Sequence, residues 1–123
     1  MSRLALSTVL ALVLAVPAAA SPWTLFPAPP VNATTPVERG AVVFQGRCEI
    51  CHGTGRDRAG TISLGFKYGK DKPALLTERT DLTADAVKFY VRNGSAMMPY
   101  FRKTELSDPE LADLAAYLSR KKR

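Results

Sequence analysis

The 123-residue chain is poor in the residues from which most metal sites and disulfide scaffolds are built. It holds one histidine, which excludes any site that needs two histidines from the same chain. It holds two cysteines, which excludes a disulfide-dense scaffold. No alternation of β-branched and polar residues is long enough to predict a strand, and no internal repeat occurs. At this length, the chain accommodates one small domain.

The overall composition is that of an ordinary globular chain. Apolar residues make up 46% and charged residues 23%, which excludes wholesale disorder and collagen-like or coiled-coil structure. Lys and Arg outnumber Asp and Glu by 17 to 11, so the formal net charge is +6. A basic surface of this kind favours an acidic partner, whose approach it accelerates electrostatically.

The first 20 residues have the three parts of a secretory signal peptide. Arg3 precedes an apolar run from Leu4 to Val16, and after Pro17 the segment Ala18–Ala20 offers a small-x-small cleavage site. A membrane anchor needs about 20 apolar residues, and no second apolar run follows, so the pattern favours cleavage. We therefore expect residues 1–20 to be removed, leaving an exported, soluble, periplasmic chain without a transmembrane segment.

Residues 21–35 are predicted to form an extended arm. Five prolines occur between Ser21 and Pro36, and proline fixes the backbone and removes hydrogen-bond donors. The domain itself is predicted to span residues 36–123. A domain of this size buries a limited core, so it depends on a disulfide, a metal or a cofactor.

Three helices are predicted in the domain. The first begins with the capping box Thr35–Glu38, with proline at the first helical position, and continues toward Cys48. The second is capped by Thr83 and ends at Gly94. The third begins with a second capping box, Ser107–Glu110.

Two of these helices have an apolar face, and the segments 53–73 and 95–105 are predicted to be loops. The face of the second helix is formed by Val87, Tyr90 and Val91. In the third helix the apolar residues fall at i, i+3, i+4 and i+7, and they are Leu111, Leu114, Ala115 and Leu118. The sequence therefore predicts an all-α fold whose long loops need something to pack on.

Residues 48–52 are Cys-Glu-Ile-Cys-His, which is the C-x-x-C-H attachment motif for c-type haem. Cysteines three apart lie on nearly one helical face, so both thiols can reach the vinyl groups along one haem edge. The adjacent His52 then points its imidazole at the iron. We predict one haem c, bound covalently through Cys48 and Cys51, with His52 as an axial ligand.

Three other uses of these residues agree less well with the sequence. A structural zinc site needs four ligands, and the chain offers no second cluster. A thioredoxin-type pair follows a buried strand, whereas a predicted helix precedes Cys48. A plain disulfide accounts for both cysteines but leaves the adjacent His52 unexplained.

The second axial ligand is predicted to be Met98. After removal of residues 1–20, methionine occurs only at Met97 and Met98, in one loop. A thioether is a soft ligand that favours reduced iron. Adjacent residues of an extended loop point in opposite directions, and Pro99 restricts the backbone of the residue before it, which favours Met98. Ligation by Met97, and a role for both methionines as apolar fillers, stay open.

The chain resembles the class I c-type cytochromes over about residues 36–120. The resemblance rests on Gly40 and Phe44, on the C-x-x-C-H motif, on Met98-Pro99-x-Phe101, and on a terminal helix that ends in Ala116-Tyr117-Leu118. It implies a cytochrome c-like fold with three main helices and long loops wrapped around one covalent haem.

The resemblance also implies roles for single residues. The first and last helices should cross near a right angle, with Gly40 allowing close approach and with Phe44 and Tyr117 filling the contact. In this family a proline carbonyl accepts the Nδ1 proton of the axial histidine. Pro73 is the nearest fit, so it is the expected partner of His52, and the bond would raise the basicity of the ring.

The function that the resemblance implies is electron transfer and not catalysis, because His52 and Met98 together leave no iron position open to a substrate. Residues 91–99 and 105–108 are similar to cytochrome subunits of periplasmic dehydrogenases such as the cresol-methylhydroxylase-type flavocytochromes. We expect a periplasmic single-electron carrier that accepts electrons from a dehydrogenase and passes them to an oxidase or another cytochrome. The alternatives are a tightly bound subunit of a flavin- or quinone-dependent dehydrogenase, and a five-coordinate haem enzyme or gas sensor.

The partner surface is predicted from basic residues in loops expected near the haem edge. They are Lys67, Lys70, Lys72, Arg102 and Lys103. The apolar residues Trp23, Leu25 and Phe26 of the arm are a second candidate contact. Nucleic acid is not expected as a partner, because the chain is predicted to be exported.

Overall fold

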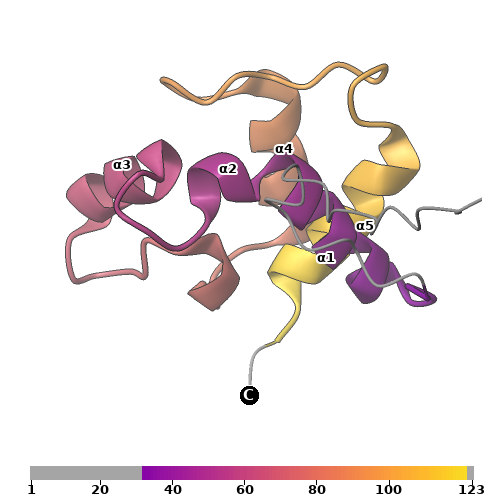
Figure 1. Cartoon of the computed structure of the whole chain (residues 1–123), viewed down its shortest axis with the longest axis horizontal. Helices are drawn as coiled ribbons and strands as arrows, with labels where there is room; N and C mark the ends of the chain where they lie inside the picture. The colour runs from indigo at the N-terminus through magenta and orange to yellow at the C-terminus, as the bar shows by residue number, and fades with distance from the viewer. Residues whose placement is uncertain (1–31, 122–123) are drawn as a thin grey trace, which may run out of the picture.

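The computed structural model describes residues 32–121, and the regular structure in that range is helical. The elements are α1 (Pro36–Arg47), α2 (Glu49–His52), α3 (Ala59–Tyr68), the 3₁₀ turn η1 (Leu76–Glu78), α4 (Ala84–Asn93) and α5 (Asp108–Ser119). The all-α fold class is confirmed, with α1, α4 and α5 as the three expected helices (Figure 1). The expected signal peptide and the greater part of the proline-rich arm lie outside the described residues.

Both predicted capping boxes are confirmed. At the start of α1, the Thr35 hydroxyl accepts a hydrogen bond from the Glu38 amide at 3.2 Å, and the Glu38 carboxylate accepts one from the Thr35 amide at 2.9 Å. Ser107 and Glu110 make the same reciprocal pair before α5. Each box satisfies amide groups that the first helical turn leaves without partners. Local sequence therefore fixes where both helices begin.

The capping carboxylate of Glu38 makes stability depend on pH. Hydrogen bonds from the Thr35 and Thr34 amides lower the pKa of Glu38 from 4.5 to about 2. A carboxyl whose pKa falls on folding contributes stability that is complete above its unfolded pKa and is lost as pH falls through its folded pKa. We expect the melting temperature of the wild type to fall between pH 4.5 and 2 more steeply than that of Glu38→Gln. The amide of the variant can still cap the helix but does not titrate. Parallel thermal melts of the two proteins across this window would contradict the assignment.

Helices α1 and α5 cross in the most extensive helix contact of the described structure (Figure 1). A Cβ added to Gly40 would lie 2.0 Å from the carbonyl oxygen of Asp113, so only glycine fits there. The Phe44 and Tyr117 rings pack with their centroids 5.7 Å apart. Arg39 closes the contact by donating two hydrogen bonds to the Asp113 carboxylate, at 2.7 and 2.9 Å. The contacts expected of Gly40, Phe44 and Tyr117 are therefore confirmed.

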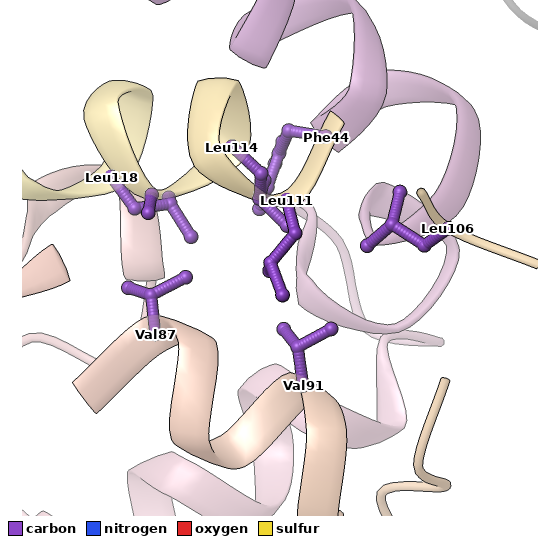
Figure 2. Packing of buried hydrophobic residues seen from close by; sticks show 8 residues of the cluster. Phe44, Val87, Val91, Leu106, Leu111, Leu114 and Leu118 are labelled. Atoms are coloured by element: carbon purple, nitrogen blue, oxygen red, sulfur yellow. The ribbon is translucent and has the colours of Figure 1, made fainter. Parts of the chain in front are cut away.

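The hydrophobic core lies between α1, α4 and α5. Its buried members are Phe44, Val87, Val91, Leu106, Leu111, Leu114, Ala115 and Leu118. Figure 2 shows Leu118 and Leu111 of α5 facing Val87 and Val91 of α4. Every residue predicted for the apolar face of the last helix is buried.

The prediction that Tyr90 belongs to the apolar face of α4 is wrong, because its side chain is 45% exposed. The inward ridge of α4 follows Ala84, Val87 and Val91, at i, i+3 and i+7, and Ala84 packs against the core from its partly buried position. Tyr90 flanks this ridge, where its hydroxyl can stay in water and its ring contacts Phe89 edge-on.

The prediction of a loop over residues 53–73 is wrong, because α3 occupies Ala59–Tyr68. Two glycines inside this helix, Gly60 and Gly65, lower its intrinsic helix propensity. Its apolar residues also lack a helical period, and none of its residues is buried. The helix makes tertiary contacts with the end of α2. In one of them, the Thr61 hydroxyl donates a hydrogen bond to the Gly53 carbonyl at 2.9 Å. Such a contact between segments cannot be read from local sequence.

Candidate haem site

The C-x-x-C-H motif forms the junction between α1 and α2. The Cys48 amide donates to the Phe44 carbonyl at 2.8 Å and closes α1. The Cys48 carbonyl then accepts from the Cys51 and His52 amides, at 3.1 and 2.8 Å, which starts a new helical turn. One turn of helix therefore carries both thiols and the imidazole, as the spacing predicts.

The two thiols have different surroundings, and both are free. Cys48 is partly buried against the hydrophobic core, and burial raises the pKa of its thiol to about 12. Cys51 is exposed. The pair therefore lies at the edge of the core, with one sulfur inside and one accessible from outside.

His52 is partly buried, and burial lowers the pKa of its imidazole. A lowered pKa keeps the ring neutral, which leaves one nitrogen lone pair available to a metal. Its Nδ1 atom is buried and has no hydrogen-bond partner among the described residues. The prediction that Pro73 accepts the Nδ1 proton is therefore wrong. The chain between the two residues forms α3, which brings Gly60 against the ring, whereas Pro73 is exposed.

A tight turn presents Met98 after the end of α4. Ser95 and Met98 exchange two backbone hydrogen bonds, of 3.0 and 2.8 Å. Gly94, which ends α4 as predicted, has φ +73°, and a Cβ there would lie 2.7 Å from the Met98 carbonyl oxygen. Glycine is needed at this position both for the backbone angle and for the space.

The two adjacent methionines differ in exposure. Met98 is half-buried and packs against the hydrophobic core, whereas the Met97 side chain is 78% exposed. Of the two, only Met98 packs inward, and which methionine faces the iron stays a prediction. This turn and the C-x-x-C-H motif approach the same apolar cluster, because Cys48 packs against it as well.

Arg92 supports the methionine loop, and the sequence analysis did not identify this role. Its guanidinium donates to the Phe101 carbonyl at 2.9 Å and pairs with the Asp108 carboxylate at 2.8 Å. The Phe101 amide donates in turn to the Val91 carbonyl at 2.8 Å. The loop is thus held at its far end to both α4 and α5. A basic residue in the last turn of a helix is the only sequence pattern that indicates such a contact.

The donor groups at this site fit haem c. Two thiols three residues apart suit the vinyl groups, and a neutral imidazole and a thioether are both known axial ligands of haem iron. Within residues 32–121, no group of three or more His, Cys, Asp or Glu side chains could hold a metal ion. The described part of the chain therefore offers no conventional zinc site.

Ion pairs offset the positive charge of several basic residues that were predicted to contact a partner. Lys72 pairs with Asp81 at 2.8 Å. Two further pairs are Arg102 with Glu105, at 2.9 Å, and Lys103 with Asp108, at 2.8 Å. Lys67 lies over the ring of Tyr68, 5.3 Å from its centre. The positive field of this region is therefore weaker than the number of cations suggests.

The helices of the described region are too short, or too polar, for any of them to cross a membrane.

Comparison with known families agrees with the all-α cytochrome c-like fold. Residues 35–118 match the family model described as cytochrome C oxidase, cbb3-type, subunit III. The match runs from the cap of α1 to the last buried leucine of α5, which is more than half of the chain. No curated protein matches the chain, so the finer likeness to cresol-methylhydroxylase-type subunits is not supported by a relative. The chain belongs to this family of c-type cytochromes, whose domain is that of a haem-based electron-transfer protein.

Proposed function

We propose that this protein is a single-electron carrier whose haem is bonded through Cys48 and Cys51 and whose iron is ligated by His52 and Met98. The observation that carries the proposal is that the C-x-x-C-H helix and the half-buried Met98 approach one hydrophobic cluster from two separate segments. When bound, the haem supplies an Fe(III)/Fe(II) couple. The chain supplies the two axial atoms, an apolar surround that keeps water away, and a soft sulfur that favours the reduced state.

The attachment and the closed iron position can be tested together on the purified mature protein. We expect the pigment to stay with the polypeptide in acidified organic solvent, because thioether bonds survive this extraction. We also expect the reduced protein to bind carbon monoxide slowly or not at all, because both axial positions are filled. Pigment that extracts freely would contradict attachment through the cysteines. Rapid, tight binding of carbon monoxide would instead favour a five-coordinate haem enzyme or gas sensor.

We propose further that residues 1–20 direct export and are removed, and that the domain over residues 36–123 works in the periplasm. A periplasmic dehydrogenase is the proposed electron donor, and an oxidase or another cytochrome is the proposed acceptor. The family description, which names an oxidase, supports the acceptor. Purification from the native source separates a free carrier from a stable dehydrogenase subunit: a subunit would elute with its larger flavin- or quinone-dependent partner.

The positive charge is expected to accelerate reaction with anionic partners. With hexacyanoferrate(III) as the oxidant, the second-order rate constant should fall as salt is added, because screening weakens electrostatic steering. Lys70→Glu should lower the rate several-fold at low salt, because one site supplies only part of the roughly 10- to 1000-fold acceleration that steering spans. Lys88→Glu is the control: it makes the same change of charge but lies outside the basic residues expected near the haem edge, so its effect should be smaller. Equal effects of the two variants would contradict a docking role for Lys70.

A further inference from the structure

The first turn of α3 is fastened to α2, directly beside His52. The Arg58 guanidinium donates to the Ile50 carbonyl at 3.3 Å and to the Thr54 carbonyl at 3.2 Å. The Thr61 hydroxyl donates to the Gly53 carbonyl at 2.9 Å. These bonds come from the residues on either side of the start of α3, so the backbone between them has little freedom to move away from α2.

Gly60 lies in this fastened turn and touches the imidazole. A Cβ added at Gly60 would lie 2.7 Å from Cε1 and 2.8 Å from Nδ1 of His52, and 2.8 Å from the Cys51 carbonyl oxygen. All three distances are shorter than a carbon atom tolerates. Since Gly60 sits in the regular helix α3 and has no positive φ, the space beside the ring is what requires glycine.

The Nδ1 side of the His52 ring has no hydrogen bond within residues 32–121 that could orient the ring. A metal-bound histidine usually donates its second ring nitrogen to a carbonyl or carboxylate, which fixes the ring plane. Nδ1 of His52 is buried and has no such acceptor among residues 32–121. Gly60 lies next to this atom, since a Cβ there would be 2.8 Å from Nδ1.

We propose that Gly60 is the positioning residue for His52: the backbone of α3 sets the rotation of the imidazole by direct contact, in place of a hydrogen bond. The inference rests on the proposed ligation of the haem iron by His52. A methyl group at position 60 would turn the ring or push α3 away from it. Because the ring plane governs how unpaired electron density spreads over oxidised haem, this rotation is visible in the paramagnetic NMR shifts of the haem methyl groups.

The test compares Gly60→Ala with Gly65→Ala in the full chain, matured with its haem. Gly65 lies in the same helix, but a Cβ there would meet only the Ala74 Cβ, at an ordinary 3.7 Å. We expect Gly60→Ala to change the spread of the haem-methyl resonances and the g values of the oxidised protein, while the sulfur-to-iron band is retained. Gly65→Ala should leave all three unchanged. If Gly60→Ala only lowers the melting temperature and leaves the resonances in place, Gly60 is structural and the proposal is overturned.

If Gly60→Ala does not mature, Thr61→Val decides the question. This variant keeps the shape of the side chain but removes the hydroxyl that holds α3 to the Gly53 carbonyl. We expect the haem-methyl resonances to move, and an unchanged spectrum would overturn the proposal. A wild type without the sulfur-to-iron band would refute the proposed ligand pair and this inference together. A wild type with the band and an unaltered variant spectrum would refute this inference alone.

Discussion

Replacing Met98 with alanine is expected to abolish the sulfur-to-iron charge-transfer band and to lower the reduction potential. A thioether stabilises Fe(II) more than water does, so its removal favours Fe(III). We expect a drop of a few tenths of a volt, a sizeable part of the roughly 0.8 V over which axial ligands set haem potentials. The reduced variant should also bind carbon monoxide rapidly, because a methyl group cannot fill the sixth position. Absorption spectra and a redox titration measure these effects.

Met97→Ala is the matched control in the same turn. Its side chain is 78% exposed, and the backbone bonds between Ser95 and Met98 do not involve it. We therefore expect an intact charge-transfer band and a nearly unchanged potential. Loss of the band in Met97→Ala, with the band retained in Met98→Ala, would mean that the turn reverses when the haem binds and that Met97 is the ligand.

The beginnings of α1, α4 and α5 could be predicted from sequence because a cap is a local structure. Thr35, Thr83 and Ser107 each accept a bond from the amide three positions further into their helix. The haem motif is equally local, since one helical turn carries both thiols and the imidazole. Met98 could be favoured over Met97 because proline restricts the residue that precedes it. All these predictions depend on neighbours within about one turn of chain.

The features that the sequence analysis missed depend on contacts between segments. The two glycines of α3 argue against a helix, yet one of them lets α3 approach His52. Pro73 is only the proline nearest to the family pattern, and α3 lies between it and His52 in the chain. Arg92 joins a helix end to a loop carbonyl and to the start of α5. None of these pairings leaves a periodic pattern in the sequence, so only the fold reveals them.

Both proposed iron ligands depend on glycines that let one segment of the chain approach another. Gly94 lets the Met98 turn fold back on the end of α4, and Gly60 lets α3 reach the imidazole. Each contact leaves no room for a side chain, so it positions a ligand with backbone atoms, which move less than side chains do. A rigid ligand pair suits an electron carrier, because the iron then changes its charge with little rearrangement of its surroundings.

Gly40→Ala is expected to destabilise the protein strongly, because the added methyl group would meet α5. Its Cβ would lie 2.0 Å from the Asp113 carbonyl oxygen and 2.7 Å from the Tyr117 Cβ. Overpacking typically lowers the free energy of unfolding by 1–3 kcal/mol. Because this clash is with backbone, which yields less than a side chain, we expect a loss of about 3 kcal/mol. The gain in helix propensity returns about 1 kcal/mol. The net loss of about 2 kcal/mol corresponds to a melting temperature lower by roughly 8–16 °C for a domain of this size.

Gly46→Ala is the control on the same helix, since a Cβ at Gly46 meets nothing within 4 Å. It carries the same gain in helix propensity without the clash, so we expect stability to be unchanged or higher by up to about 1 kcal/mol. Thermal melts of the two variants with haem attached therefore separate the effect of the packing clash from the effect of helix propensity. If Gly40→Ala melts as high as Gly46→Ala, α1 and α5 can move apart without loss, and their close crossing is not what holds this fold together.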